Sequence, residues 1–256
     1  MTDVANEWAS HASVQPSNEW WRPTRQLATW LTWLFAVQAV LQLANVFVVD
    51  NAEIYVRWHD AFDALLDGRD RTAQRIFDDN PGQSSGLSSL AGFIGIAALV
   101  LLIVWMWRSA HNARALGRTG ARLSPGWAIG AWFIPFANFV IPVLIMQDLW
   151  RGATPSTPRG DPTWRSAKGS WLIGVWWAAW LVSLLRFGAS NAGLHDAASL
   201  DDIQNSNTVA LVGVVATAIA AVLAAFVVWT LSRRQLDTLR AQRAAYDAAT
   251  DAPAPG

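Results

Sequence analysis

Long runs without charged residues are the feature that most constrains how this chain can fold. Gln26 to Val49 contains 24 residues and no charged side chain. A helix of that length, rising ~1.5 Å per residue, crosses a hydrocarbon core of ~30 Å with some tilt. Lipid offers no hydrogen-bond partner to the backbone, so a segment of this kind must cross as a helix. The runs predicted to span the membrane are 26–49, 87–107, 170–187 and 209–231.

Composition supports the same class. Hydrophobic residues make up 53% of the 256 residues and charged residues only 15%, whereas soluble domains carry about 25% charged residues. The first 22 residues lack the basic segment and short apolar core of a cleaved signal. The sequence therefore predicts an all-α integral membrane protein with four transmembrane helices.

A fifth apolar stretch, Ser124 to Arg151, is interrupted by prolines. Pro125 lies at its start, and Pro135 and Pro142 lie in its interior, each of these two removing a backbone hydrogen bond that lipid cannot replace. Residues 127–149 can span the membrane, re-enter it or lie at its interface. We expect a re-entrant or interfacial segment broken near Pro135 and Pro142.

The distribution of charge decides between these topologies, because basic residues mark the cytoplasmic loops. If 127–149 does not span, 14 of the 19 basic residues fall on the side of both termini, and 11 of the 19 acidic residues fall on the other. If it spans, the basic segment 151–169 and the basic tail move outside. We therefore expect both termini in the cytoplasm. Arginine supplies 18 of the 19 basic residues, which with the abundant alanine indicates a bacterial plasma membrane protein.

The rest of the chain divides around one membrane domain, 25–236. A flexible cytoplasmic segment, 1–24, precedes it, and a partly disordered cytoplasmic tail, 237–256, follows it. Apolar residues at helical spacing from Ile54 onward, with Gly68 as a stop, predict a short extracytoplasmic helical cap within 50–80. A second short helix is expected over 72–79.

Two sets of polar residues are candidate sites within the membrane. Gln38, Gln42 and Asn45 fall at i, i+4 and i+7 on one helical face, which either bonds to neighbouring helices or lines a path for a solute. Asn138 lies between the two prolines of the broken stretch, where transporters and channels build binding sites. The five arginines that border this stretch set the topology and are candidate contacts for anionic lipid headgroups: Arg108, Arg114, Arg118, Arg122 and Arg151.

Other classes of site lack support in the sequence. The chain has no cysteine, no phosphate-binding loop and no recognisable catalytic template. His59 and Asp63 form an i, i+4 pair that could hold a metal, but a solvated helix face explains the pair as well. The formal charge of zero gives no nucleic-acid footprint. We expect no enzyme activity, no cofactor and no metal site.

One block of residues is specific enough to indicate a family. The run His111 to Gly117, the sequence SPGWA from Ser124, and WFIPFAN from Trp132 to Asn138 resemble the bacterial family called domain of unknown function 4328. The similarity continues through Pro142, Met146, Leu149-Trp150-Arg151 and Trp176-Trp177, and it covers about residues 25 to 236. This chain has Gln147-Asp148 where similar proteins often carry Arg-Glu. The resemblance implies an architecture and supplies no mechanism.

The leading expectation for function is a non-enzymatic membrane component that scaffolds or regulates a protein partner. A small-solute channel or transporter, using Asn138 and the Gln38 face, is the alternative, and a lipid-binding role lies between the two. The oligomeric state stays open.

Overall fold

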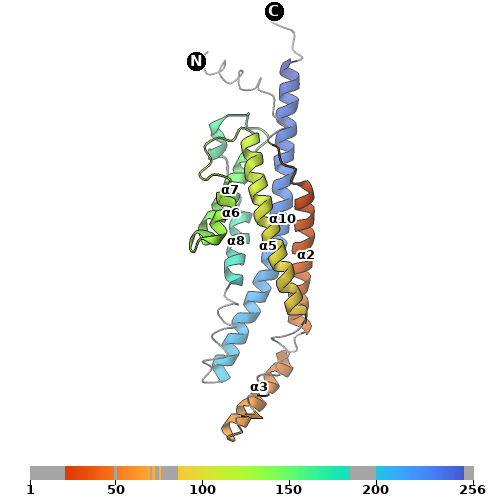
Figure 1. The fold of residues 1–256 in the computed structure, drawn as a ribbon, viewed down its shortest axis with the longest axis vertical. Helices are drawn as coiled ribbons and strands as arrows, with labels where there is room; N and C mark the ends of the chain where they lie inside the picture. Colours follow the sequence, from red (N-terminus) through yellow and green to blue (C-terminus); the bar gives the residue numbers. More distant parts are fainter. Residues whose placement is uncertain are drawn as a thin grey trace, which may run out of the picture. The chain divides into compact units, whose positions relative to one another are not determined.

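The computed structural model describes residues 21–48, 51–69, 71–72, 75, 86–184 and 200–250, and every element in these ranges is helical. The predicted helix over 72–79 and the far end of the third predicted span lie largely outside these residues. The described chain forms two compact units: unit 1 comprises residues up to 33, 98–178 and from 223 onward, and unit 2 comprises 34–97 and 179–222. The elements, labelled in Figure 1, are α2 (Arg25–Val48), α3 (Asn51–Leu66), α5 (Gly86–Ala115), α6 (Trp127–Gly130), η2 (Ala131–Phe133), α7 (Ala137–Gly152), η3 (Pro162–Ser166), α8 (Trp171–Ser183) and α10 (Leu200–Thr250).

Three of these helices, α2, α5 and α10, are long and apolar enough to cross a bilayer. They coincide with the predicted spans 26–49, 87–107 and 209–231, which confirms an all-helical chain with membrane-like helices. The third predicted span, 170–187, begins as α8, which has 13 residues within the described chain. That length corresponds to ~20 Å and is short of a full crossing.

The large apolar side chains of these helices are sorted between core and surface. Leu31, Trp105 and Leu231 are fully buried, whereas Trp30, Trp33 and Phe93 are mostly exposed. Exposed aromatic and aliphatic side chains along charge-free helices are what a lipid environment requires. The helices therefore suit contact with the acyl chains of a bilayer.

The helices α3 and α5 end at the glycines expected from the sequence. Gly117 has φ +72°, and the N–H of Arg118 donates to the carbonyl of Ala113 while that of Gly117 donates to Arg114. This six-to-one and five-to-two pattern is the Schellman motif, which needs a left-handed residue after the helix. Gly68, with φ +69°, makes the equivalent bonds after α3.

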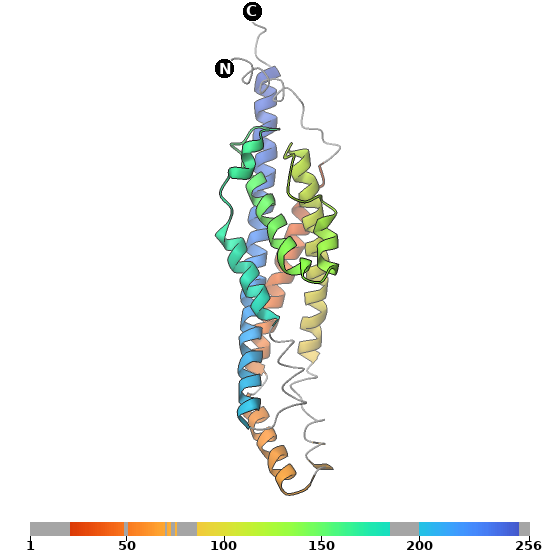
Figure 2. The ribbon, with the colours of Figure 1, turned by 90° about the vertical axis from the view of Figure 1, so that its left-hand side faces the viewer.

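The proline-broken stretch folds back on itself. The helices α6 and η2 end at Phe133, the chain reverses at Ile134 to Phe136, and α7 returns alongside them (Figure 2). We call residues 127–152 the hairpin and Phe133–Phe136 its tip. A break near Pro135 is present as expected, but a break at Pro142 is not. Pro142 is accommodated inside α7 as its sixth residue, where the loss of one hydrogen bond does not end the helix.

The C-terminal helix extends farther than the sequence indicated. It runs without a break across the expected boundary at 236/237 and reaches Thr250. In unit 1 its later part lies beside the end of α5 (Figure 1), where the indole N–H of Trp105 donates to Ser232 Oγ at 2.9 Å. The two helices thus stay paired beyond their apolar portions.

Candidate functional site

Arg118 is the centre of a polar cluster in unit 1. Its side chain is 1% exposed and donates from Nε to Gly152 O at 2.8 Å, from Nη1 to Pro158 O at 2.6 Å, and from Nη2 to the carbonyls of Thr157 and Thr154 at 2.9 and 3.2 Å. Four of the five N–H bonds of the guanidinium are thus used. The first acceptor ends α7, so the cation also faces the negative end of that helix.

Burial lowers the pKa of Arg118 to about 10, and the nearby carboxylate of Asp161 opposes the shift. The side chain therefore stays protonated at neutral pH. Its role is to bind the segment after α7 to the segment after α5, which replaces the lipid contact expected from the sequence.

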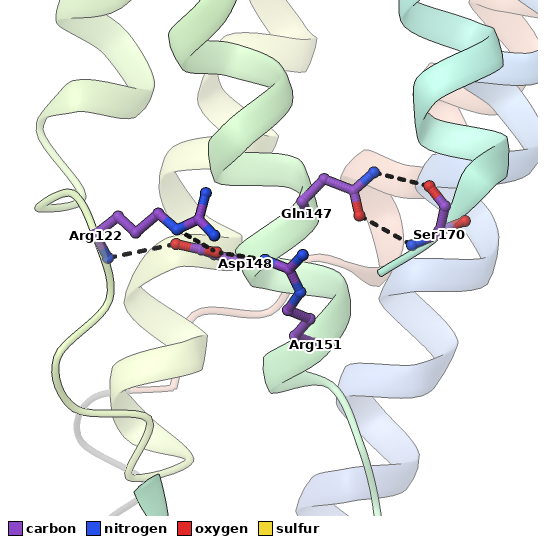
Figure 3. A network of polar contacts seen from close by, with 5 residues as sticks. All are labelled: Arg122, Gln147, Asp148, Arg151 and Ser170. Atoms are coloured by element: carbon purple, nitrogen blue, oxygen red, sulfur yellow. Dashed lines mark hydrogen bonds and ion pairs between the residues drawn. The ribbon is translucent and has the colours of Figure 1, made fainter. Parts of the chain in front are cut away.

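Two amide side chains each bind both groups of one peptide unit. Gln147 donates from Nε2 to Ser170 O at 2.7 Å and accepts from Ser170 N–H at 2.9 Å (Figure 3). Asn112 accepts from Arg22 N–H at 2.7 Å and donates to Arg22 O at 2.8 Å. Only a side chain with both a donor and an acceptor can make such a pair. Gln147 thereby positions the start of α8, and Asn112 positions the approach to α2.

Asp148 is held between two arginines from different elements (Figure 3). Its Oδ1 lies 3.3 Å from Arg151 Nη1 and 3.7 Å from Arg122 Nε, and its Oδ2 accepts from the Arg122 backbone N–H at 3.3 Å. The Asp148 side chain is only 13% exposed, whereas that of Arg122 is 54% exposed. The carboxylate therefore fixes the loop before α6 against α7 and carries two positive partners.

A small pocket of about 30 Å³ lies beside this cluster. Arg114 comes from the end of α5, Asp148 from α7 and Trp164 from η3, while Ser124 lies in the loop before α6. Trp164 is 2% exposed, and its Nε1–H has no hydrogen-bond partner. The remaining lining is Ala110, Ala113, Arg118, Ala121, Leu123, Pro125, Ile145 and Leu149.

A tryptophan of α8 bonds to the hairpin close to its internal proline. Pro142 has no N–H, so the carbonyl of Asn138 loses its helical partner. The next carbonyl, that of Phe139, accepts from Trp177 Nε1–H at 2.8 Å. The Oδ1 of Asn138 is buried and has no hydrogen-bond partner. Trp177 of α8 thus bonds to α7 one residue after the carbonyl that Pro142 leaves without its helical donor.

The predicted polar face on α2 belongs to unit 2, whereas Asn138 belongs to unit 1. Gln38 and Gln42 are both buried. An added Cβ on Gly95 would lie 3.4 Å from Gln38 Nε2, so α5 approaches Gln38 at a glycine. The Oε1 of Gln38 has no partner. Asn45 lies on α2, but its side chain is outside the described residues.

The other bordering arginines remain accessible in part. Arg114 and Arg122 are exposed, and Arg108 and Arg151 are half-buried. Arg108 donates to Pro23 O at 3.3 Å. Pro125, which we expected only to interrupt the stretch, is buried and lines the pocket. The structure thus brings Arg114, Arg122 and Arg151 to one polar cluster around Asp148 and the pocket.

A buried polar seam between α5 and α10 was not foreseen from the sequence. Gln235 Nε2 donates to Ser109 O at 3.1 Å, and Gln242 Nε2 donates to Leu116 O at 3.2 Å. Thr238 is fully buried between them in sequence. The spacing 235, 238 and 242 places these side chains on one helical face, a pattern that could have indicated the contact.

The cap pair His59 and Asp63 is present, with 3.3 Å between Nδ1 and Oδ2 and with both side chains more than half exposed. Within the described residues no group of three or more His, Cys, Asp or Glu side chains could hold a metal ion. The exposure of both side chains is that of a solvated helix face.

The comparison with known families finds a match, which covers most of the helices described above. Residues 77–233 match the family described as "Domain of unknown function (DUF4328)". No curated protein and no solved structure matches the chain. The match covers more than half of the sequence and includes α5, the hairpin, α8 and most of α10.

Proposed function

The chain belongs to the DUF4328 family, and we propose that it is a non-enzymatic component of the bacterial plasma membrane that scaffolds or regulates a partner protein. The main support for this proposal is the exposure of the C-terminal end of α10. Beyond Gln242 the helix continues to Thr250, and its side chains are almost all exposed. A rigid helix that projects from a membrane bundle presents a surface on which a protein partner can pack.

The polar residues of unit 1 support a structural role. Arg118, Gln147 and Asn112 direct their donors at backbone carbonyls of other segments. Side chains bound in this way fix the arrangement of loops and are not free to transfer protons or attack a substrate. The cluster thus suits a chain that holds a shape for a partner.

The proposed topology has four spans, with both termini in the cytoplasm and α3 on the outer surface. The hairpin re-enters from the cytoplasmic side with its tip directed into the bilayer. Phe133 and Phe136 at the tip are 76% and 82% exposed, and α7 is ~24 Å long, less than a full crossing. An exposed aromatic tip between basic flanks suits insertion into one leaflet. The flanking arginines Arg108, Arg114, Arg122 and Arg151 would then contact lipid headgroups.

Site-specific photocrosslinking in native membranes tests the scaffold. A photoreactive residue at Ala244 or Ala248, both exposed, should give one and the same crosslinked protein. The matched position Gln242, which is buried against α5, should give none. Absence of a crosslink from both exposed positions, or the same pattern from the buried one, would contradict the proposal.

A channel or transporter is the second candidate, favoured by two buried oxygens without partners, Gln38 Oε1 and Asn138 Oδ1. Unsatisfied acceptors at membrane depth are costly and suit a transient solute or water. In vesicles reconstituted with the purified protein, Asn138→Leu and Gln38→Leu should each abolish solute flux. Flux that is unchanged in both variants would rule this candidate out.

A further inference from the structure

The pocket beside Asp148 is lined by a residue whose side-chain donor makes no hydrogen bond with the described part of the chain. Trp164 lines it, is 98% buried, and has an Nε1–H without an acceptor. The indole nitrogen is a donor only, and an unmade buried hydrogen bond costs free energy. An occupant of the pocket must therefore supply an acceptor.

The charge around the pocket selects the kind of acceptor. Arg114 and Arg118 line it, and Arg122 and Arg151 lie against Asp148. Asp148 is the one carboxylate in the lining, and it already faces two of these four arginines. The Arg114 side chain is exposed and makes no hydrogen bond or ion pair with the described residues. A negatively charged acceptor is thus favoured over a neutral one.

The size of the pocket narrows the choice further. A volume of about 30 Å³ admits about two or three oxygen-sized atoms, which corresponds to the oxygens that one phosphate group turns toward a protein. Ser124, also in the lining, adds a hydroxyl that can donate. We propose that this pocket binds the phosphate group of an anionic ligand, with Trp164 Nε1–H and the Arg114 guanidinium as donors.

This site does not depend on the scaffold role, because phosphate binding can be measured on the purified protein alone. The phosphate can belong to a lipid headgroup or to a soluble ion. The full chain is purified in a neutral maltoside detergent without phosphate buffer. Binding is then measured calorimetrically, with inorganic phosphate in one arm and mixed micelles containing phosphatidylglycerol in the other. Micelles containing phosphatidylcholine provide the zwitterionic comparison.

Four variants make the test specific. Trp164→Phe keeps an aromatic ring and removes the N–H, and Arg114→Gln removes the charge at an exposed position. Each should weaken binding about tenfold or more. Trp171→Phe and Arg240→Gln are the matched controls, since both residues are exposed and neither lines the pocket; they should leave binding unchanged. The indole N–H resonance that disappears in Trp164→Phe should shift on addition of the ligand.

Each outcome has a meaning. If the two pocket variants lose only the binding of phosphatidylglycerol, the phosphate group belongs to a lipid headgroup. If they lose only the binding of inorganic phosphate, it belongs to a soluble ligand. The proposal is overturned if neither probe binds, or if Arg114→Gln binds as the wild type does. Arg114 is exposed, so Arg114→Gln should fold as the wild type does. It therefore tests phosphate binding even if Trp164→Phe fails to fold.

Discussion

Arg118 shows how far a single side chain departs from the role that its charge suggests. A sequence of basic residues beside a membrane segment predicts headgroup contacts, and it does so equally for Arg114, Arg118 and Arg122. Only the folded chain shows that the segments after α5 and α7 enclose Arg118 and direct four carbonyls at it. Arg114 and Arg122, by contrast, stay exposed.

Replacement of Arg118 should destabilise unit 1 strongly. Arg118→Met keeps most of the side-chain volume but leaves four carbonyls without their donor, which should lower the free energy of unfolding by about 3 kcal/mol. Thermal unfolding of the purified protein in detergent measures this. Arg165→Met is the control, since Arg165 is exposed and makes one bond of 3.2 Å to Thr119 O. If both variants lost the same free energy of unfolding, the conclusion that Arg118 stabilises unit 1 more than an exposed arginine does would be wrong.

The Gln147 amide should be replaceable only by a group that both donates and accepts. Gln147→Glu keeps the shape but cannot donate to Ser170 O when ionised, so we expect a loss of about 1–3 kcal/mol. The same unfolding measurement applies, with Gln26→Glu, an exposed position on α2, as the control. A Glu variant as stable as the wild type would show that the double hydrogen bond is not needed.

At the scale of elements, helix ends and spans could be predicted, and tertiary partners could not. The apolar runs and the glycines after Leu66 and Leu116 carry local signals, because length, hydropathy and a left-handed residue act within one segment. The bond to Phe139 O depends instead on Trp177, which is 38 residues away in sequence. The polar seam of Gln235 and Gln242 likewise depends on where α5 ends.

Gly117 should not tolerate a side chain. Its φ of +72° disfavours an L residue, and an added Cβ would lie 2.6 Å from Arg159 Cγ and 2.8 Å from Gly160 N. Gly117→Ala should therefore cost about 2 kcal/mol or more in unfolding free energy. Gly174→Ala is the control, because that glycine lies inside α8 with nothing within 4 Å, and it should be neutral or mildly stabilising. A neutral effect at Gly117 would contradict the close approach of the Arg159 loop.

The hairpin turn holds Phe136 in a conformation that suits glycine, with φ +64°. Both Phe136→Gly and Phe136→Ala remove the ring, but only glycine relieves the backbone strain. In detergent the glycine variant should therefore be more stable than the alanine variant by about 1 kcal/mol. Thermal unfolding of the pair gives this difference directly. A more stable alanine variant would mean that the turn is built differently.

For the whole molecule, the sequence predicts the membrane class and the family, and the candidate site only in part. The sequence indicates Asn138, Gln38 and the arginines by their types and positions. It does not indicate Asn112 or Trp164, whose roles depend on the fold. The side of the membrane on which each loop lies is still inferred from the distribution of basic residues, because the lengths of the helices do not determine it.

Cysteine labelling tests the central claim most directly, since the chain has no cysteine of its own. Single cysteines are placed at Ser156 after the hairpin, at His59 on α3 and at Ala245 near the end of α10, all exposed positions. An impermeant thiol reagent added to intact cells should label the cysteine at 59 and leave those at 156 and 245 unlabelled until the membrane is opened. Labelling at 156 in intact cells would show that residues 127–149 span the membrane and would contradict the re-entrant hairpin.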